Sequence, residues 1–548
     1  MNTQVAIVGG GPVGLVLALF LDHYGVQSLV VESAPTTRWV PKGSTHNART
    51  MEHYRRLGIA SAMRNRGLPA EHATDLAYFN RYSGWELARR PQPSEADRLR
   101  MRTASVRTDQ FVEPLFRCNQ MYVERYLLEQ AKTRPNITLR YGCEADSFHA
   151  DDAGTALTVN PAEDKPERWA AQYLVGCDGS QSELRRWLGI RYDGADTLDH
   201  GRAFYAGQMF ATYLRAPTLY RDYFGKKPAW LYWSVNPEFQ TALVAVNGVD
   251  EFLMFLKTPV RGGPPDNSTI GRSMGRDDIP FEILSQSPWT AGVALVAQSF
   301  GRGRVHLAGD SVHLFTPTGG FGMNTGIDDT ANLSWKLAAA VHGWAGDGLL
   351  STYEAERRPI AQRNTGAARE LAKVVTAVPV PPELEQLNGA GEAARRVLGA
   401  ALAEHRDEVT SWGVQLGARY DQSQLTVSDT APPADVHADY VPSAIPGGRA
   451  PHVWMNEHRG NGDSLFDQFG RGFTLLELGR NPSSSAGLQA AAAACGMPLK
   501  TLRIDDPLIR EVYERDLVMV RPDQHIAWRG NRLPDNPARL IAQMIGAA

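Results

Sequence analysis

Three stretches of this 548-residue chain combine glycines with carboxylates at spacings that suit the binding of a nucleotide. Residues 9–14 (GGGPVG) are followed by Glu32, Asp178-Gly179 lies further along, and Gly309-Asp310 leads into a second glycine-rich loop. Glycine lets the backbone approach a ligand with no Cβ in the way, and free backbone N–H groups attract phosphate. Carboxylates accept hydrogen bonds from ribose and other hydroxyls. The three stretches therefore predict a site for a phosphate-bearing cofactor.

The first stretch has the elements around it that a dinucleotide site requires. A short apolar strand precedes it, an apolar helix over residues 15–24 follows, and a second strand over residues 28–31 ends at Glu32. This is G-x-G-x-x-G in context, with an acid 18 residues past the last glycine, where it can bind ribose hydroxyls. The three glycines allow a tight turn, the approach of a pyrophosphate and close helix–strand packing, and they are Gly9, Gly11 and Gly14.

The loop after Gly309-Asp310 is predicted to hold the N-terminus of a helix at a fixed point. Residues 305–308 form the strand before it, and Asn324 opens the helix. Such a terminus carries unpaired N–H groups and partial positive charge, so it attracts an anion. Gly320 and Gly322 let a flat ligand come close. Taken alone, this stretch is also compatible with an ordinary strand, turn and helix.

Composition excludes several classes of protein. Hydrophobic residues make up 43% of the chain and charged residues 21%, as in ordinary globular proteins of several domains. The net charge of −3 gives no basic surplus for nucleic acid, no apolar run suits a membrane span, and no signal peptide is recognised. Four scattered cysteines form neither CxxC nor metal-ligand spacing. We therefore expect a cytoplasmic protein without a metal site.

With residues 174–179 (LVGCDG) between the other two motifs, the chain resembles the FAD-dependent aromatic hydroxylases of the para-hydroxybenzoate and phenol hydroxylase type. The resemblance implies that residues 9–14 hold the ADP half of FAD. It also implies that Asp178-Gly179 lies near the pyrophosphate and that Gly309-Asp310 binds the ribityl chain. Backbone N–H groups at Met323-Asn324 would stabilise negative charge on the reduced flavin, and Pro317 would line its reactive face.

Further segments match this family, and some positions depart from it. Residues 47–52 (NARTME) resemble the segment that opens a helix beside the flavin, and Gln120 resembles a FAD-contacting glutamine. A phenol hydroxylase carries a candidate carboxylate base where this chain has Ser44, so that base is not carried over, and His46 is the candidate in its place. The predicted catalytic residues are His46 and Pro317, and the predicted cofactor-binding residues are Gly9, Gly11, Pro12, Val13, Gly14, Glu32, Ser33, Lys42, Arg49, Gln120, Ala145, Asp178, Gly179, Asp310, Pro317, Gly320, Gly322, Met323 and Asn324.

The middle of the chain is rich in β-branched and aromatic residues interrupted by glycine and proline, which predicts a sheet. In a fold of this family, that sheet would cover one side of the flavin ring and hold the substrate. Tyr205, Tyr232 and Trp233 offer flat apolar faces with polar tips and are the predicted substrate-binding residues. Packing within the sheet is the alternative for any one of them.

The last part of the chain predicts two long helices, over residues 351–375 and 382–405, and then a β-α-β-β-β-α unit. This unit resembles the thioredoxin-like tail of the larger phenol and polyketide hydroxylases. It lacks CxxC, so it cannot exchange dithiols and is expected to be structural or to serve assembly. The predicted fold is α/β, with a Rossmann-like FAD-binding domain at residues 1–74, 106–190 and 301–345, an interleaved β-sheet substrate domain at 75–105 and 191–300, a helical segment at 346–430, and a thioredoxin-like domain at 431–548.

The resemblance implies hydroxylation of a phenolic or polycyclic aromatic substrate by O2 through a flavin C4a-hydroperoxide. The implied cofactors are FAD and, as a transient co-substrate, NADPH or NADH. Baeyer–Villiger insertion or epoxidation, an oxygen-independent FAD oxidoreductase and a non-catalytic flavoprotein remain as alternatives. We expect no nucleic-acid or membrane partner. The oligomeric state stays open, with a homodimer as one option.

Overall fold

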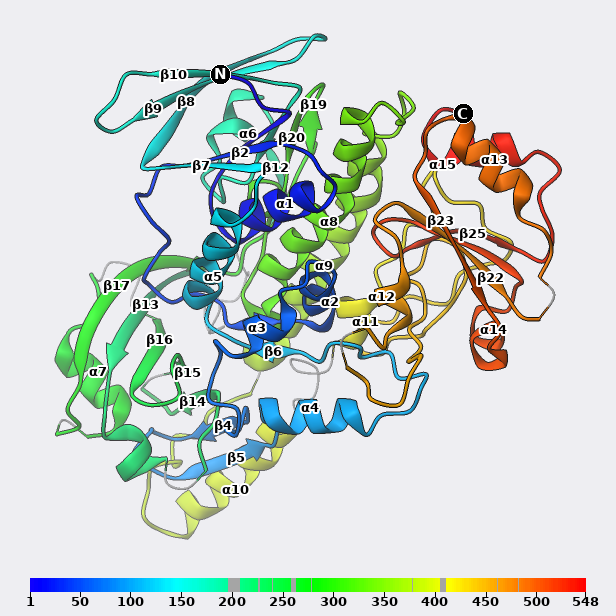
Figure 1. Cartoon of the computed structure of the whole chain (residues 1–548). Helices are drawn as coiled ribbons and strands as arrows, with labels where there is room; N and C mark the ends of the chain where they lie inside the picture. The colour runs from blue at the N-terminus through cyan, green and yellow to red at the C-terminus, as the bar shows by residue number, and fades with distance from the viewer. Residues whose placement is uncertain are drawn as a thin grey trace.

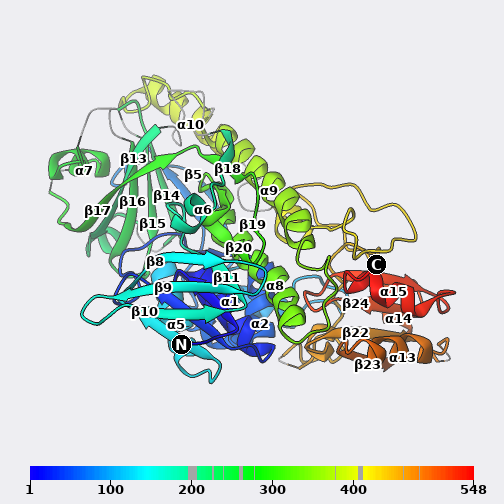
Figure 2. The same cartoon turned by 90° about the horizontal axis from the view of Figure 1, so that it is seen from above.

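The computed structural model describes residues 1–195, 207–224, 227–238, 240–257, 263–276, 278–376, 378–404, 411–460, 462–480 and 482–548. Three bodies are arranged around two long helices, α8 (Phe321–Val341) and α9 (Thr352–Thr376). In both views a large sheet domain lies to one side of these helices, and the C-terminal domain, coloured orange to red, lies on the other (Figures 1 and 2). The amino-terminal α/β domain packs between them.

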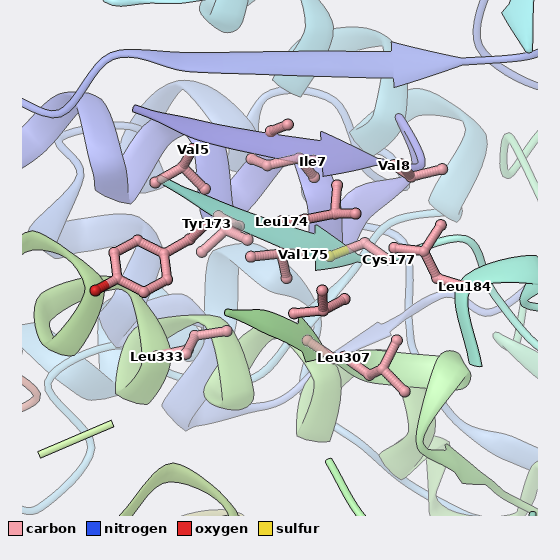
Figure 3. Close-up of a cluster of buried hydrophobic side chains, with 14 of the residues drawn as sticks. Val5, Ile7, Val8, Tyr173, Leu174, Val175, Cys177, Leu184, Leu307 and Leu333 are labelled. Carbon is pink, nitrogen blue, oxygen red and sulfur yellow. The ribbon is translucent and has the colours of Figure 1, made fainter. Parts of the chain in front are cut away.

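The amino-terminal domain contains a six-stranded sheet of order β19-β20-β11-β1-β2-β7, in which all neighbours except β19 and β20 are parallel. Helices and a small antiparallel sheet within residues 143–171 pack on the faces of this sheet, so the strands are apolar along their length, and Figure 3 shows their side chains packed with Leu333 of α8. The predicted strands are confirmed to within one residue. The strands are β1 (Val5–Val8), β2 (Ser28–Glu32), β7 (Ile137–Tyr141), β11 (Tyr173–Gly176), β19 (Gly301–Arg302) and β20 (Val305–Leu307).

The helices of this domain begin earlier than the apolar patterns suggested. Helix α1 (Pro12–His23) starts at Pro12, because proline is well suited to the first helical position. Helix α8 starts at Phe321, three residues before Asn324. Helix α5 (Gln120–Lys132) starts at Gln120, as predicted. The remaining helices here are α2 (Ala48–Arg56), α3 (Ala60–Arg64), α4 (Glu95–Thr103) and α6 (Glu183–Trp187).

The sheet domain is built on seven strands in the order β17-β13-β16-β15-β14-β4-β5. Side chains alternate between its two faces, as the pleat requires. One face packs on α5, α9 and α10 (Gly389–Ala403), and the other packs on α7 (Asn267–Met274). The strands are β4 (Leu76–Phe79), β5 (Glu86–Arg90), β13 (Gly207–Arg215), β14 (Leu231–Val235), β15 (Gln240–Ala245), β16 (Glu251–Lys257) and β17 (Glu282–Ala291).

The C-terminal domain has a four-stranded sheet of order β23-β22-β24-β25, with helices on both faces. The predicted order of elements is confirmed with one addition, α14, which the sequence analysis missed. Its Cys495 is a free thiol. The elements are β22 (Phe473–Leu478), α13 (Ala486–Ala494), β23 (Leu499–Ile504), α14 (Pro507–Tyr513), β24 (Leu517–Val520), β25 (Ile526–Gly530) and α15 (Pro537–Met544).

Among the described residues, the remaining β-strands form three small sheets, and two further short α-helices accompany them. Within the described ranges no helix is long and apolar enough to cross a membrane, and no cluster of histidine, cysteine and carboxylate side chains suits a metal ion. The remaining elements are β3 (Thr45–His46) with β6 (Phe116–Arg117); β8 (Cys143–Ala150), β9 (Thr155–Pro161) and β10 (Glu167–Ala171); β12 (Tyr192–Ala195), β18 (Ala294–Ala297) and β21 (His313–Leu314); α11 (Trp412–Leu416) and α12 (Leu465–Gln468).

Candidate active site

The glycines of the loop between β1 and α1 have two different roles. At Gly9, with φ of +111°, an added Cβ would collide with the Cys177 carbonyl, and at Gly14 it would collide with the Gly9 carbonyl. Both are therefore needed for packing. At Gly11 an added Cβ would meet nothing within 4 Å. Gly11 thus borders open space at the N-terminus of α1, where a phosphate would meet free N–H groups.

Glu32 is fixed beside this loop at the carboxyl end of β2. The Gly10 N–H donates to its Oε2 at 2.7 Å, and the Ala34 N–H donates to its Oε1 at 2.9 Å. These bonds orient the carboxylate while leaving lone pairs for further donors. Ser33, the next residue, is exposed, with its hydroxyl 3.4 Å from the same carboxylate. The geometry suits Glu32 for binding a pair of ribose hydroxyls.

Asp310 follows shortly after β20. Its side chain is exposed to water. Desolvation by the surrounding protein raises the pKa of its carboxyl. Lys42 and Arg38 are near enough to lower that pKa in part. A carboxylate in such a place is available to hydroxyl groups of a bound ligand.

Behind Asp310 stands a buried set of charges that the sequence analysis missed. Asp329, on α8, accepts hydrogen bonds from the Gly309 N–H at 3.1 Å and from His313 Nε2 at 2.6 Å. Its other oxygen accepts from Arg357 Nε at 2.8 Å. All of these side chains are buried. Asp329 and Arg357 therefore fix the turn that presents Asp310, and only the folded arrangement of α8 and α9 reveals it.

The N-terminus of α8 is open to a ligand. Gly320, at the N-cap, has φ of +67°, no side chain caps the helix, and its first turn contains no acidic residue. The first N–H groups of this 21-residue helix are therefore available to an acceptor. An added Cβ at Gly320 would lie 2.9 Å from Thr45 Cβ, so β3 closes one side of this terminus. Pro317 is exposed at the entrance.

Comparison with known proteins gives these features an identity. Residues 2–368 match the family model of the FAD binding domain, and residues 443–548 match that of the C-terminal part of aromatic-ring hydroxylases. The chain is a FAD-dependent aromatic-ring hydroxylase. The FAD-dependent monooxygenase apdD of Emericella nidulans is 32% identical to it, over 99% of this chain and 90% of that protein. A putative polyketide hydroxylase of Streptomyces halstedii is 31% identical, over 96% and 93%.

Solved structures agree with this hydroxylase along its whole length. The structure of RebC with bound 7-carboxy-K252c is 34% identical, has a TM-score of 0.89 and is covered in full, as is this chain. That of aklavinone-11 hydroxylase with FAD and aklavinone is 27% identical, with a TM-score of 0.79 and 99% of both chains covered. That the space at Gly11, the carboxylates of Glu32 and Asp310 and the open terminus of α8 bind the parts of FAD stays a prediction of the resemblance.

Several predicted FAD ligands of this hydroxylase have side chains that serve the protein itself. Asn324 accepts from the Asn47 N–H at 2.9 Å and donates to the carbonyls of Thr45 and Gly320, so it ties β3 to α8. Asp178 accepts from the Leu184 N–H at 3.2 Å at the start of α6. Gln120 donates to Glu124 at 2.7 Å. Gly179, Met323 and Ala145 are partly buried, and Ala145 lies on β8. Their contacts with FAD remain predictions.

Pro12 and Val13 contribute through packing. Pro12 is the buried first residue of α1. The Val13 side chain lies 2.9 Å from where a Cβ of Gly309 would be and 2.8 Å from that of Gly326. Val13 thus fills the space that these two glycines leave, and it holds the first glycine loop against the turn of Asp310. Lys42 is exposed near Asp310, and burial together with Arg38 lowers the pKa of its ammonium group.

His46 does not suit the catalytic role that we considered. It is fully buried, with Nε2 3.2 Å from the Cys118 carbonyl oxygen and its ring between those of Tyr54 and Phe116. Burial lowers the pKa of its imidazole to about 4. An imidazole that does not reach solvent cannot exchange a proton with a bound substrate. His46 is a core residue that supports β3 and β6.

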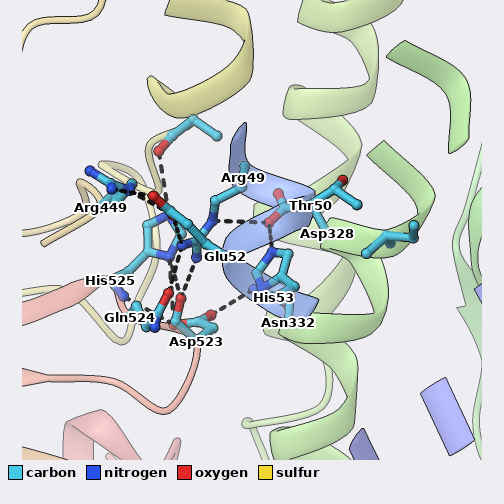
Figure 4. Close-up of polar contacts among 12 residues, drawn as sticks. Arg49, Thr50, Glu52, His53, Asp328, Asn332, Arg449, Asp523, Gln524 and His525 are labelled. Carbon is cyan, nitrogen blue, oxygen red and sulfur yellow. Dashed lines mark hydrogen bonds and ion pairs between the residues drawn. The ribbon is translucent and has the colours of Figure 1, made fainter. Parts of the chain in front are cut away.

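Arg49 also has a different place from the predicted one. Its Nη1 donates to Glu52 Oε2 at 2.9 Å and to Gln524 Oε1 at 2.7 Å, and its Nη2 donates to the Asp523 carbonyl at 2.7 Å (Figure 4). The guanidinium is thereby committed to the turn between β24 and β25 of the C-terminal domain. Arg49 links α2 to that domain, and we no longer place it among the FAD ligands.

The predicted substrate residues separate onto opposite faces of the large sheet. Tyr232 is fully buried on the α7 side, stacked on Phe224 with centroids 3.8 Å apart, so it cannot reach a substrate near the flavin. Trp233 points to the other face, as neighbouring residues of a strand must. Tyr205 lies outside the described residues. The partly exposed aromatic side chains on the Trp233 side were missed, and they are Tyr122, Trp230, Phe255 and Trp289.

Replacing Asp310 with alanine is expected to strip FAD from the purified protein. Charge-assisted hydrogen bonds contribute about 1.5 to 3 kcal/mol each, so losing two of them weakens binding by about a hundredfold or more. Flavin content and the dissociation constant for added FAD measure the effect. Asp347→Ala, at an exposed position beyond α8, is the control. A D310A protein with normal yellow colour and flavin content would refute the role.

Proposed function

We propose that this hydroxylase inserts one oxygen atom of O2 into a planar, fused-ring phenol, with NADPH or NADH as the reductant. The observation that carries the proposal is the junction at β3. Trp230 Nε1 donates to Ser44 Oγ at 3.0 Å, and the neighbouring Thr45 packs against Gly320 at the N-terminus of α8. The aromatic face of the large sheet and the expected place of the flavin ring therefore meet at two adjacent residues.

FAD, when bound, accepts hydride from the nicotinamide and activates O2. The chain's own residues position and protect that chemistry. When FAD is bound, the N–H groups at the start of α8 would stabilise negative charge that develops on the flavin. Asp310 and Glu32 orient the cofactor's hydroxyls, and the sheet excludes water from the reacting atoms.

The lining of the aromatic face favours a flat, extended substrate over a single small ring. Phe255 and Trp289 have centroids 5.5 Å apart, and the Arg117 guanidinium lies 3.5 Å from the centre of the Trp230 ring. Rings of this kind stack on a fused aromatic system. The relatives support this class, since RebC was solved with 7-carboxy-K252c and aklavinone-11 hydroxylase with aklavinone.

Oxygen uptake, NAD(P)H oxidation and product formation should be measured together for a panel of fused-ring phenols and for phenol itself. The proposal predicts that a fused-ring compound stimulates NAD(P)H oxidation most strongly. Structure determination of the product by NMR separates ring hydroxylation from Baeyer–Villiger insertion and epoxidation. Turnover without oxygen uptake would instead support an oxygen-independent oxidoreductase.

Trp230→Leu is expected to raise the KM for an aromatic substrate about tenfold and to divert more NAD(P)H oxidation away from product. The reason is the loss of stacking and of the bond to Ser44, which together contribute about 1.5 kcal/mol. Tyr232→Phe is the matched control, because Tyr232 lies on β14, two residues after Trp230, and packs on the opposite face of the sheet. Equal KM and coupling in W230L and the unmodified enzyme would remove Trp230 from the substrate site.

We infer the division of the chain from which sheet each segment joins. Strand β4 pairs with β14 and β5 pairs with β4, although the segments before and after these two strands belong to the amino-terminal domain. This pairing supports an FAD-binding domain at residues 1–74, 106–190 and 301–345 and a substrate domain at 75–105 and 191–300. Residues 346–430 and 431–548 follow as the helical segment and the thioredoxin-like domain. We also propose a cytoplasmic location. A homodimer is proposed as well, and sedimentation of the purified protein tests it.

A further inference from the structure

A cavity of about 290 Å³ lies between the C-terminal ends of α1 and α2 and the C-terminal domain. Asp310 does not line it, and the hydroxylase chemistry makes no use of it. Two aromatic rings and several charged groups face it. Its lining residues are His23, Glu52, Arg55, Arg56, Gly462, Phe466, Asp467, Phe469, Gly470, Arg471 and Gln524.

The carboxylates of this cavity are already neutralised. Glu52 forms buried ion pairs with Arg449 and, at 2.9 Å, with Arg49. Asp467 is paired with Arg55 at 2.6 Å. Arg55 in turn also binds Glu113 at 2.8 Å. Neither acid is therefore left to balance a further cation.

Two guanidinium groups of the cavity have no such partner. Among the described residues, neither Arg56 nor Arg471 has a carboxylate within 4.0 Å. Arg56 donates through Nη2 to the Gly470 carbonyl at 3.0 Å, while its Nε is buried without an acceptor in the described chain. Arg471 is exposed. The cavity therefore carries positive charge that the protein does not balance.

A neutral histidine also lines this cavity. The Nε2 of His23 is buried out of reach of solvent and has no hydrogen-bond partner in the described part of the structure. Burial and the nearby Arg56, Arg471 and Arg134 lower the pKa of His23 to about 3, so its ring stays neutral and adds no charge of its own. The carbonyl groups at the C-terminal ends of α1 and α2 have other donors than these two arginines. The Val26 N–H binds the Leu21 carbonyl, and the Ile59 N–H binds that of Tyr54.

We propose that this interdomain cavity, with Arg56 and Arg471 as donors, binds a small oxyanion of the phosphate class. Guanidinium groups bind phosphate through paired N–H donors, and a site between two domains is a common place for a ligand. Gln524 lines the cavity and also accepts from Arg49 at 2.7 Å. A bound anion would therefore strengthen the contact between α2 and the C-terminal domain.

Titration calorimetry of the FAD-loaded enzyme with inorganic phosphate, against chloride at equal ionic strength, tests this site. We expect saturable binding of phosphate that Arg471→Gln weakens by about tenfold, the effect of losing one charge-assisted hydrogen bond. Arg480→Gln, which alters a highly exposed arginine of the same domain, should leave it unchanged. Arg56→Gln, checked for normal flavin content, should weaken it as R471Q does. A parallel titration with glycerol phosphate distinguishes a phosphate ester from free phosphate as the better ligand.

Two results would overturn the assignment. One is that phosphate shows no saturable binding, or that chloride binds in the same way. The other is phosphate binding that neither R471Q nor R56Q weakens. Loss of that binding in Lys42→Gln would place the phosphate near Asp310 instead, because Lys42 lies near Asp310 and does not line this cavity.

Discussion

Gly11→Asp should yield a folded protein that has lost FAD. Gly11 has φ of −75° and ψ of −175°, which any residue can adopt, and its Cβ direction is open. Aspartate is a preferred N-cap residue, so the change is expected to keep or raise the stability of the apoprotein. The same side chain would fill the space for the pyrophosphate and repel it. We expect FAD affinity to fall about a thousandfold, from the loss of about 4 kcal/mol of charged hydrogen bonds.

Gly9→Ala provides the contrast. There the added Cβ meets backbone atoms of Cys177 and the positive φ is unfavourable, so the apoprotein itself should be destabilised. Thermal unfolding of both variants without FAD, followed by titration with FAD, separates the two effects. If G11D retained tight FAD binding, or if G11D and G9A lost stability equally, the assignment of Gly11 to the cofactor would be wrong.

Glu356→Gln is expected to lower the free energy of unfolding by about 3 to 5 kcal/mol, the usual effect of removing one member of a buried ion pair. Glu356 is buried and accepts from Lys336 Nζ at 2.7 Å and from Arg521 at 2.7 and 2.8 Å. Burial acts to raise the pKa of its carboxyl, but Arg521 and Lys336 outweigh burial and hold that pKa below its usual range. The substitution leaves Lys336 without its ion-pair partner in the described chain and Arg521 paired with Asp523 alone.

The same ion pairs join α8 and α9 to the turn after β24, so E356Q should loosen the C-terminal domain as well. Glu370→Gln, which breaks the exposed pair of Glu370 with Lys373, is the control and should change stability by about 1 kcal/mol or less. Because the folded-state pKa of Glu356 is depressed, its contribution is present above about pH 4.5 and is lost as the pH falls, and E356Q should lack that part of the acid sensitivity. Urea unfolding at two pH values measures both effects, and equal midpoints for E356Q and E370Q would contradict the account.

Local sequence was sufficient for the nucleotide loops and their strands. The roles of Gly9, Gly11 and Gly14 depend on backbone geometry within a few residues, and strands buried on both faces are recognisable as apolar runs. Helix starts were harder. The turn before α8 is made by glycines with positive φ, and its first helical residue, Phe321, carries no signal that distinguishes it from a loop residue.

Long-range contacts explain what the sequence analysis got wrong. Arg49 meets Gln524, 475 positions away, and no pattern near either residue predicts that pairing. His46 is buried against Phe116, which lies on β6, the strand that pairs with β3 of His46. The faces of Tyr232 and Trp233 were predictable in part, because adjacent strand residues point to opposite sides. Which side faces the cofactor depends on the packing of α5 and α7.

The most direct test of the proposed reaction is turnover of the FAD-loaded enzyme under 18O2 with NADPH or NADH and a fused-ring phenol, followed by mass spectrometry. The account predicts a product that carries one labelled oxygen atom on the ring, formed with consumption of one NAD(P)H and one O2. NAD(P)H oxidation across the whole panel without any labelled product, or a product that forms equally well without O2, would contradict it.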